Sequence, residues 1–292
     1  MNASKFLIPL VLLLPGYALA GQPIEEEAEM SPEGRVTVIN IAGEIDIKTW
    51  DRDRVELTGD LGEGSELRFD VSGGNVRVEV EVEGRSGWGG PEPTDLELRV
   101  PARAELDLSS VSADIVVDGA GGASVEAESV SGDVDVRGDT GRLELSSVSG
   151  DITFRGTARR SAMESVSGDL ELQGLAGELE VSVVSGDVDL EGGAFDLGRF
   201  EAVSGTLELR LSIAPGGRFS AETMSGDVEL TVPADQSGEF RAQSFSGDIR
   251  SALGSPQRES AGPGTRLEHV AGDGDAQIRI ESFSGDVRIE RR

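Results

Sequence analysis

The chain has 292 residues, a formal net charge of −29 and no cysteine. The missing cysteine excludes a disulfide framework and a lipidated-cysteine anchor, and the acidic excess disfavours nucleic acid and anionic membrane surfaces as partners. Cations and basic surfaces are the electrostatically favoured partners. Aromatic residues make up only 4% of the chain while glycine occurs 40 times, which predicts a thin core of Val, Leu and Ile.

The N-terminus, residues 1–20, has the pattern of a signal peptide. Lys5 supplies a positive charge, an apolar run occupies residues 6–14, and Ala20 ends an Ala-Leu-Ala cleavage motif. The apolar run is shorter than the roughly 20 residues that a transmembrane helix needs. We therefore expect an exported chain that starts at Gly21 and is periplasmic, on the cell surface or extracellular, with no membrane insertion after signal cleavage.

Two segments precede the regular part of the chain. Residues 21–34 are rich in glutamate, which predicts a flexible acidic leader. Residues 35–104 contain the unit strand, glycine turn, strand at 36–47 and again at 69–80. We expect this segment to form irregular N-terminal β coils with longer loops.

A repeat occupies residues 105–292. The tripeptide Ser-Gly-Asp, counted together with two near-matches, recurs at a spacing of 18 to 21 residues, except for the last spacing, which is 38 because of an inserted loop at 251–275. Fixed periodicity of this length is typical of stacked repeat architectures. The tripeptides start at Ser131, Ser149, Ser167, Ser185, Ser225, Ser246 and Ser284, with near-matches at Ser112 and Ser204.

The residues after each Asp alternate between apolar and polar, which indicates strands with one buried face. The position directly after the Asp is apolar in every repeat. It is occupied by Ile115, Val134, Ile152, Leu170, Val188, Leu207, Val228, Ile249 and Val287.

Two all-β architectures can use this unit. In a single-stranded β-solenoid each repeat of about 18 to 21 residues is one coil stacked on the next. In an antiparallel β-meander, the alternative, Gly-Asp is a two-residue hairpin loop. We favour the solenoid because its corners can turn a further apolar row inward. That row is Val130, Val148, Val166, Val184, Met224, Phe245 and Phe283.

The Gly-Asp pairs are the candidate structural site. An Asp after Gly can accept hydrogen bonds from nearby backbone N–H groups and fix a turn. Ca²⁺ bridging neighbouring carboxylates is the other interpretation, with Asp133, Asp151, Asp169 and Asp187 as cation candidates. The turn residues are Gly132, Asp133, Gly150, Asp151, Gly168, Asp169, Gly186, Asp187, Gly226, Asp227, Gly247, Asp248, Gly285 and Asp286.

Catalytic motifs are scarce, and we expect no catalytic residue and no cofactor. His269 is the only histidine, so a charge-relay triad lacks its usual base. A polysaccharide-active enzyme with paired carboxylates is the alternative, because glycosidases need only Asp and Glu. Such a site favours exposed aromatic platforms, and Trp50 and Trp88 are the only tryptophans.

Residues 36–47, 96–112 and the Ser-Val-Ser-Gly-Asp units that follow resemble the bacterial putative adhesin family of β-strand-repeat proteins. This family is a domain of unknown function that is similar to the head domains of putative autotransporter adhesins. The resemblance implies a right-handed β-helix and assigns no catalytic or binding residues. We interpret the chain as a non-enzymatic structural or adhesin-like interaction module with an unknown envelope or extracellular partner.

Overall fold

The computed structural model describes residues 21–82, 92–258 and 264–292, and within these residues every regular element is a strand. The N-terminal strands are β1 (Gln22–Glu29), β2 (Arg35–Trp50), β3 (Arg54–Leu61), β4 (Ser65–Ser72), β5 (Asn75–Val82) and β6 (Thr94–Pro101). The middle strands are β7 (Glu105–Ala120), β8 (Ser124–Ser129), β9 (Val134–Ser147), β10 (Ile152–Ser165), β11 (Leu170–Gln173), β12 (Gly177–Ser185), β13 (Val188–Ser204) and β14 (Leu207–Thr223). The C-terminal strands are β15 (Val228–Val232), β16 (Gly238–Ser244), β17 (Ile249–Ser251), β18 (Gln257–Arg258), β19 (Thr265–Ala271), β20 (Gln277–Ser282) and β21 (Val287–Arg291).

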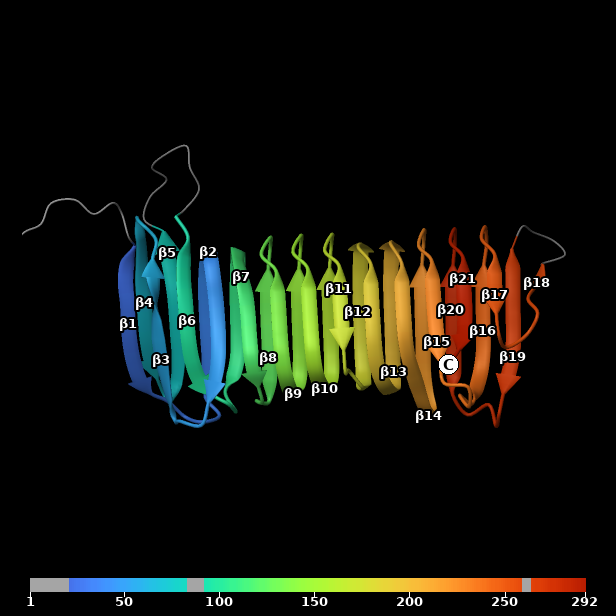
Figure 1. The fold of residues 1–292 in the computed structure, drawn as a ribbon, viewed down its shortest axis with the longest axis horizontal. Coiled ribbons are helices and arrows are strands. Elements are labelled where there is room, and N and C mark those ends of the chain that lie inside the picture. Colours follow the sequence, from blue (N-terminus) through green and yellow to red (C-terminus); the bar gives the residue numbers. More distant parts are fainter. Residues whose placement is uncertain (1–20, 83–91, 259–263) are drawn as a thin grey trace, which may run out of the picture.

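The all-β prediction is confirmed, and the strands lie side by side in one long row (Figure 1). In the middle of the row each repeat pairs in parallel with the next. Ile152 lies opposite Val134 on one side and Leu170 on the other, and Leu170 lies opposite Val188. These side chains are at most 2% exposed. The predicted inward row is therefore a buried row, and the pairing is not that of an antiparallel meander.

Each long strand bends once, so that one repeat contributes to two faces of the stack. β10 bends at Gly156, where φ is +153°. A Cβ atom there would lie 1.8 Å from the carbonyl oxygen of Gly138 in the neighbouring repeat. The bend therefore requires glycine both for its backbone conformation and for the close approach of the stacked chains.

Chain order and stacking order differ at the C-terminal end. β20 lies between β14 and β16, and β21 lies between β15 and β17, so the last repeat of the chain is inside the stack. The expected loop at 251–275 contains β18 and β19, and β19 runs antiparallel along β16. The doubled spacing before Ser284 therefore corresponds to a detour around the outer repeat, which Figure 1 shows at the red end of the row.

The N-terminal end has the same kind of arrangement. β2 lies between the β5–β6 repeat and β7, so the first repeat of the chain is also inside the stack. The prediction that 69–80 is a coil is wrong, because β4 and β5 form an antiparallel hairpin. Its loop residues Gly73 and Gly74 have φ of +61° and +82°, which suits a two-residue hairpin loop with positive φ at both positions.

The flexible acidic leader predicted at 21–34 is also corrected by the structure. Gln22–Glu29 forms β1, which pairs antiparallel with β3. Ile24 is only 7% exposed, and Arg54 forms an ion pair with Glu27. The backbone ladder and one buried isoleucine hold a segment that its charge alone would assign to disorder.

Candidate functional site: an exposed apolar row beside an acidic wall

One apolar side chain per repeat is exposed at the corner before each Ser-Gly-Asp turn. We call these nine residues, which are 43% to 61% exposed, the apolar row. Seven of them were predicted to face inward, and that prediction is wrong. In stacking order they are Val111, Val130, Val148, Val166, Val184, Val203, Met224, Phe283 and Phe245.

The reason is strand alternation, because the residue that precedes each of these residues faces inward. It is a serine or threonine in seven repeats, and Val183 or Ala202 in the other two. Leu145 and Ser147 face inward on β9, so the strand alternation continues and Val148 faces outward. The Gly150 N–H donates to Ser147 Oγ over 2.9 Å. Closing the corner this way satisfies a backbone donor that no strand partner reaches.

Sequence reasoning missed this set of inward hydroxyls. They are 0% to 8% exposed, and each accepts the N–H three residues later over 2.7 to 2.9 Å. The signal that identifies them is a Ser or Thr at an inward position of every such repeat, where Val or Leu would be expected. They are Ser110, Ser129, Ser147, Ser165, Thr223, Ser282 and Ser244.

Main-chain hydrogen bonds between repeats hold the apolar row in line. The Ser149 N–H donates to the Val130 carbonyl oxygen over 2.9 Å, and the Ser167 N–H donates to that of Val148 over 3.0 Å. Neighbouring row residues are therefore one strand spacing apart, about 4.8 Å. The unusual stacking order also brings Phe283 onto Phe245, with ring centroids 5.0 Å apart and planes inclined by 8°.

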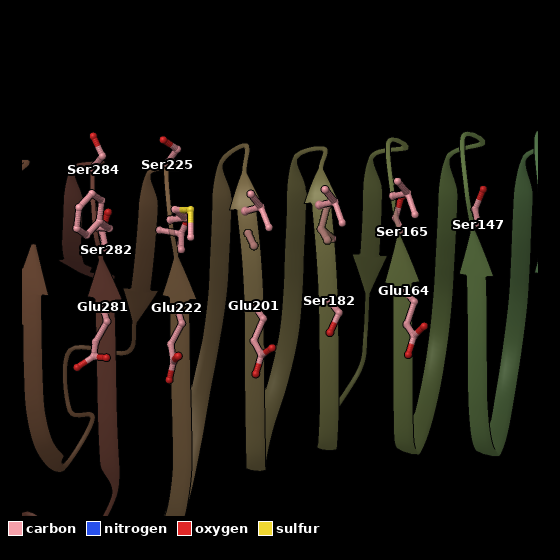
Figure 2. Close-up of a pocket in the computed structure, with 18 of the residues that line it drawn as sticks. Ser147, Glu164, Ser165, Ser182, Glu201, Glu222, Ser225, Glu281, Ser282 and Ser284 are labelled. Atoms are coloured by element: carbon pink, nitrogen blue, oxygen red, sulfur yellow. The ribbon is translucent and has the colours of Figure 1, made fainter.

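A groove of about 1350 Å³ runs along the apolar row across the strands. Its floor includes the buried Ser147, Ser165 and Thr223. On four of the strands along the groove, the residue two positions before the row residue is a glutamate, and we call these four glutamates the acidic wall (Figure 2). They are Glu164, Glu201, Glu222 and Glu281.

Among the described residues, those that line the groove include no lysine or arginine. Arg199 and Arg279 lie outside it and form ion pairs with Glu201 and Glu281. Within the described part of the chain, Glu164 and Glu222 take part in no ion pair. The groove therefore combines an apolar side with a side of net negative charge. On its apolar side the groove presents a continuous stripe of exposed apolar side chains.

The aspartates of the predicted Gly-Asp turns, which we call the Asp row, lie on the other side of the apolar row, beyond the serine and glycine of each turn. They include Asp133, Asp151, Asp169, Asp187, Asp227, Asp248 and Asp286. Its hydrogen bonds run between repeats. The Asp151 N–H donates to Asp133 Oδ1 over 2.9 Å, and the Asp169 and Asp187 N–H groups donate to the preceding Asp over 2.9 and 2.8 Å. Equivalent bonds join Asp114 to Asp133, Asp187 to Thr206, Asp227 to Asp286, and Asp286 to Asp248.

The glycines of these turns are positioned by close approach of the repeats. A Cβ atom on Gly150 would lie 2.1 Å from the Gly132 carbonyl oxygen, and one on Gly168 would lie 2.0 Å from that of Gly150. A Cβ atom would likewise lie 1.9 to 2.3 Å from a carbonyl oxygen of the neighbouring repeat if it were added to Gly186, Gly226, Gly247 or Gly285. No larger residue fits there without separating the repeats.

A second group of carboxylates lies where the first repeat stacks. Glu44 on β2 is opposite Asp95 on β6 and Asp114 on β7. Partial burial raises the pKa of Glu44 above its ordinary value, and the charges of Asp46, Asp95 and Asp114 raise it further. Among the described residues, no three Asp, Glu or His side chains converge as a metal site, either here or in the Asp row.

The features considered for catalysis are not brought together. His269 is on β19, opposite Phe240. The guanidinium carbons of Arg52 and Arg54 lie 4.9 and 5.7 Å from the centroid of the Trp50 ring, within the range of a cation–π contact. Trp88 lies outside the described residues.

Comparison with known proteins identifies the class. Residues 36–290 match the Toastrack DUF4097 family, and the chain belongs to that family. No curated protein matches the chain. In the described residues, no helix is long and apolar enough to span a membrane.

Several solved structures are similar to the chain. A putative adhesin from Bacteroides fragilis NCTC 9343 is 12% identical, with 92% of this chain and 98% of that chain covered and a TM-score of 0.47. A putative adhesin from Parabacteroides merdae ATCC 43184 is 13% identical, with coverage of 92% and 96% and a TM-score of 0.44. A putative lipid binding protein from Parabacteroides distasonis ATCC 8503 is 12% identical, with coverage of 92% and 97% and a TM-score of 0.49.

Proposed function

We propose that this chain is an exported, non-enzymatic β-solenoid that acts as an adhesin-like interaction module, with the apolar row as its contact surface. The observation that carries the proposal is the exposure of nine apolar side chains in one line, 43% to 61% each. If these side chains were buried, they would stabilise the hydrophobic core. An exposed one lowers solubility unless a partner covers it.

The parallel register supports the solenoid. In the middle of the stack each repeat pairs with the repeats before and after it along both of its faces. A chain that repeats this path can only advance along the stack, which is the geometry of a β-solenoid. The right-handed sense of the coil is part of the proposal and follows from the family resemblance.

Export is proposed from residues 1–20, which lie outside the described residues. Their charged, apolar and small-residue regions occur in the order of a secretory signal. The absence of cysteine suits an oxidising compartment, because no free thiol is left to react there. A contact surface for an envelope or extracellular partner is consistent with that location.

The test measures how much material from an envelope extract of the source cell binds to the purified wild type and to two variants. One variant changes three valines of the apolar row, and the other changes two valines outside it. Val148→Thr with Val166→Thr and Val184→Thr keeps side-chain shape and removes apolar character from the row. We expect the bound material to fall at least tenfold while the melting temperature stays within a few degrees. The control changes Val71→Thr and Val270→Thr, which are 44% and 61% exposed outside the row. Equal binding by the wild type and the row variant would reject the apolar row as the contact surface.

A further inference from the structure

We propose that the partner seats a basic amphipathic helix in the groove, with its apolar side chains on the apolar row and its lysine or arginine side chains on the acidic wall. This inference rests on the proposed function and names the chemistry of its partner.

Charge complementarity selects a basic partner. In the part of the chain that the structure describes, the groove lining holds four glutamates and no basic residue. The other side of the apolar row is followed by the Asp row, in which each carboxylate has one oxygen engaged by a backbone N–H of the next repeat. An apolar stripe between two acidic rows matches a helix whose apolar face is flanked by cationic side chains.

The groove direction selects a helix over an added strand. The groove crosses the strands, so a ligand in it lies over the side chains and cannot extend the backbone ladder of the sheet. Row residues repeat about every 4.8 Å, which is nearer to the helical pitch of about 5.4 Å than to the roughly 6.6 Å between same-side residues of a strand. Seven row residues, from Val148 to Phe245, line the groove. Their six intervals span about 29 Å, the length of a helix of roughly 20 residues.

The same charges disfavour two other occupants. An anionic membrane surface would meet the acidic wall and a chain of net charge −29. A second copy of this chain would place two acidic walls against each other and gain no opposite charge.

The experiment measures binding of three labelled 20-residue peptides to the purified protein by fluorescence anisotropy. The first has leucines on one helical face and lysines on the other, the second has glutamates in place of the lysines, and the third has the composition of the first in scrambled order. We expect the first to bind, the scrambled peptide to bind at least tenfold more weakly, and the acidic peptide not to bind. Vesicles of anionic phospholipid and sedimentation of the protein alone test the two other occupants, and we expect neither binding nor dimers.

Matched charge variants locate the contact. Glu164→Gln with Glu222→Gln removes two unpaired carboxylates of the acidic wall, and we expect affinity for the first peptide to fall about fivefold, as for two exposed ion pairs. Glu171→Gln with Glu191→Gln makes the same charge change at exposed positions outside the groove and should leave affinity within about twofold. Equal losses in the two variants would show non-specific attraction and overturn the inference.

The outcomes separate this inference from the proposed function. One outcome is that the threonine row variant loses its envelope partner while peptide affinity is the same for basic and acidic peptides and for wild-type and acidic-wall variants. In that case the basic helix is wrong and the apolar row remains the contact surface. If the row variant retains its partner, the contact surface itself is wrong. Binding of anionic vesicles, or dimers that disappear in the row variant, would replace the helix by a membrane or a second copy.

Discussion

In the middle of the molecule, from β8 to β13, chain order and stacking order are the same, whereas at both ends they differ. At the N-terminal end the first repeat, β2, lies inside the stack and the later β5–β6 repeat lies outside it. At the C-terminal end the last repeat, β20–β21, lies inside and the earlier β16–β17 repeat lies outside. Antiparallel strands then cover the outer repeats: β3 and β4 at one end, β19 at the other.

The difference shows how a parallel stack manages its edges. An uncovered outer repeat would present a row of unpaired N–H and carbonyl groups, which invites pairing with another chain. Repetition in the middle needs only a constant register. The ends need antiparallel covers and a chain path that returns inward, and this makes them dependent on contacts distant in sequence.

The largest expected effect comes from deleting the inner repeat at the C-terminal end. Removing residues 277–292 takes away β20 and β21 and leaves β14 and β16 without a shared partner. We expect a loss of more than about 5 kcal/mol of unfolding free energy, since four buried residues, Ile278, Ile280, Val287 and Ile289, are lost together.

The control deletes residues 152–169, one complete middle repeat. Val134 and Leu170 both pair with Ile152 in the same register, so they can pair with each other after the deletion. We expect this shorter chain to unfold cooperatively within about 10 °C of the wild type, given the modest loss of one repeat interface. Thermal unfolding followed by circular dichroism measures both, and the reverse ranking would contradict the comparison.

Core substitutions sharpen the comparison at single residues. Leu170→Ala, in a middle repeat where the side chain is 2% exposed, should cost about 2 to 5 kcal/mol. Leu67→Ala, on the half-buried face of the cover strand β4, should cost less than about 2 kcal/mol because less apolar area is lost. Glu171→Ala, on the exposed face next to Leu170, should stay within about 0.5 kcal/mol. Denaturant titration gives all three values, and equal losses at Leu170 and Glu171 would show the assignment of faces to be wrong.

The sequence predicted the middle better than the ends for a physical reason. Val134, Ile152 and Leu170 follow a period-two pattern that only one buried face explains, and a constant spacing fixes their partners. Phe283 stacks on Phe245 because the chain returns and places its last repeat between β14 and β16. The length of the segment between the two residues does not predict this path. The Gly73-Gly74 pair was a readable hairpin signal that the repeat interpretation overrode.

The apolar row was mispredicted because valine before a turn is typical of a core residue. Strand alternation decides the orientation of Val148, because Ser147 is the inward residue, and its hydroxyl accepts the Gly150 N–H inside the corner. Polar residues at inward positions are the sequence signal for this arrangement. The spacing alone predicts the Asp row as a candidate site, but it does not reveal that carboxylates such as those of Asp133, Asp151 and Asp169 accept hydrogen bonds from the next repeat.

A smaller effect is expected in the Asp row of the middle repeats. Asp169→Ala removes the acceptor of the Asp187 N–H and should cost about 1 kcal/mol, the net worth of one hydrogen bond. Asp169→Asn keeps an acceptor oxygen and relieves repulsion from Asp151 and Asp187, so we expect no loss. Melting temperatures in calcium and in chelator complete the test. A chelator-sensitive wild type whose sensitivity disappears in Asp169→Asn would favour the cation interpretation.

The smallest expected effect lies at the N-terminal end, where stacking out of chain order brings Glu44 between Asp95 and Asp114. The pKa of Glu44 is raised by partial burial and then by neighbouring carboxylates, Asp46 first. A carboxyl with a raised pKa in the folded state is relatively stabilising only while protonated, and that contribution is lost as the pH rises through the folded pKa. At neutral pH ionised Glu44 therefore opposes folding, and Glu44→Gln should raise stability there by no more than about 0.5 kcal/mol.

The gain from Glu44→Gln should shrink as the pH falls toward and below the ordinary glutamate pKa, because wild-type Glu44 is then also uncharged. Glu171→Gln is the matched control in the middle of the stack, where the carboxylate lies 2.9 Å from an Arg155 guanidinium nitrogen. Removing that charge should give no gain at neutral pH, because it also removes the ion pair with Arg155. Melting temperatures of the two variants across the acidic range distinguish these behaviours. A gain from Glu44→Gln that persists unchanged at low pH would mean that its cause is packing, and that the out-of-order stacking at this end carries no electrostatic cost.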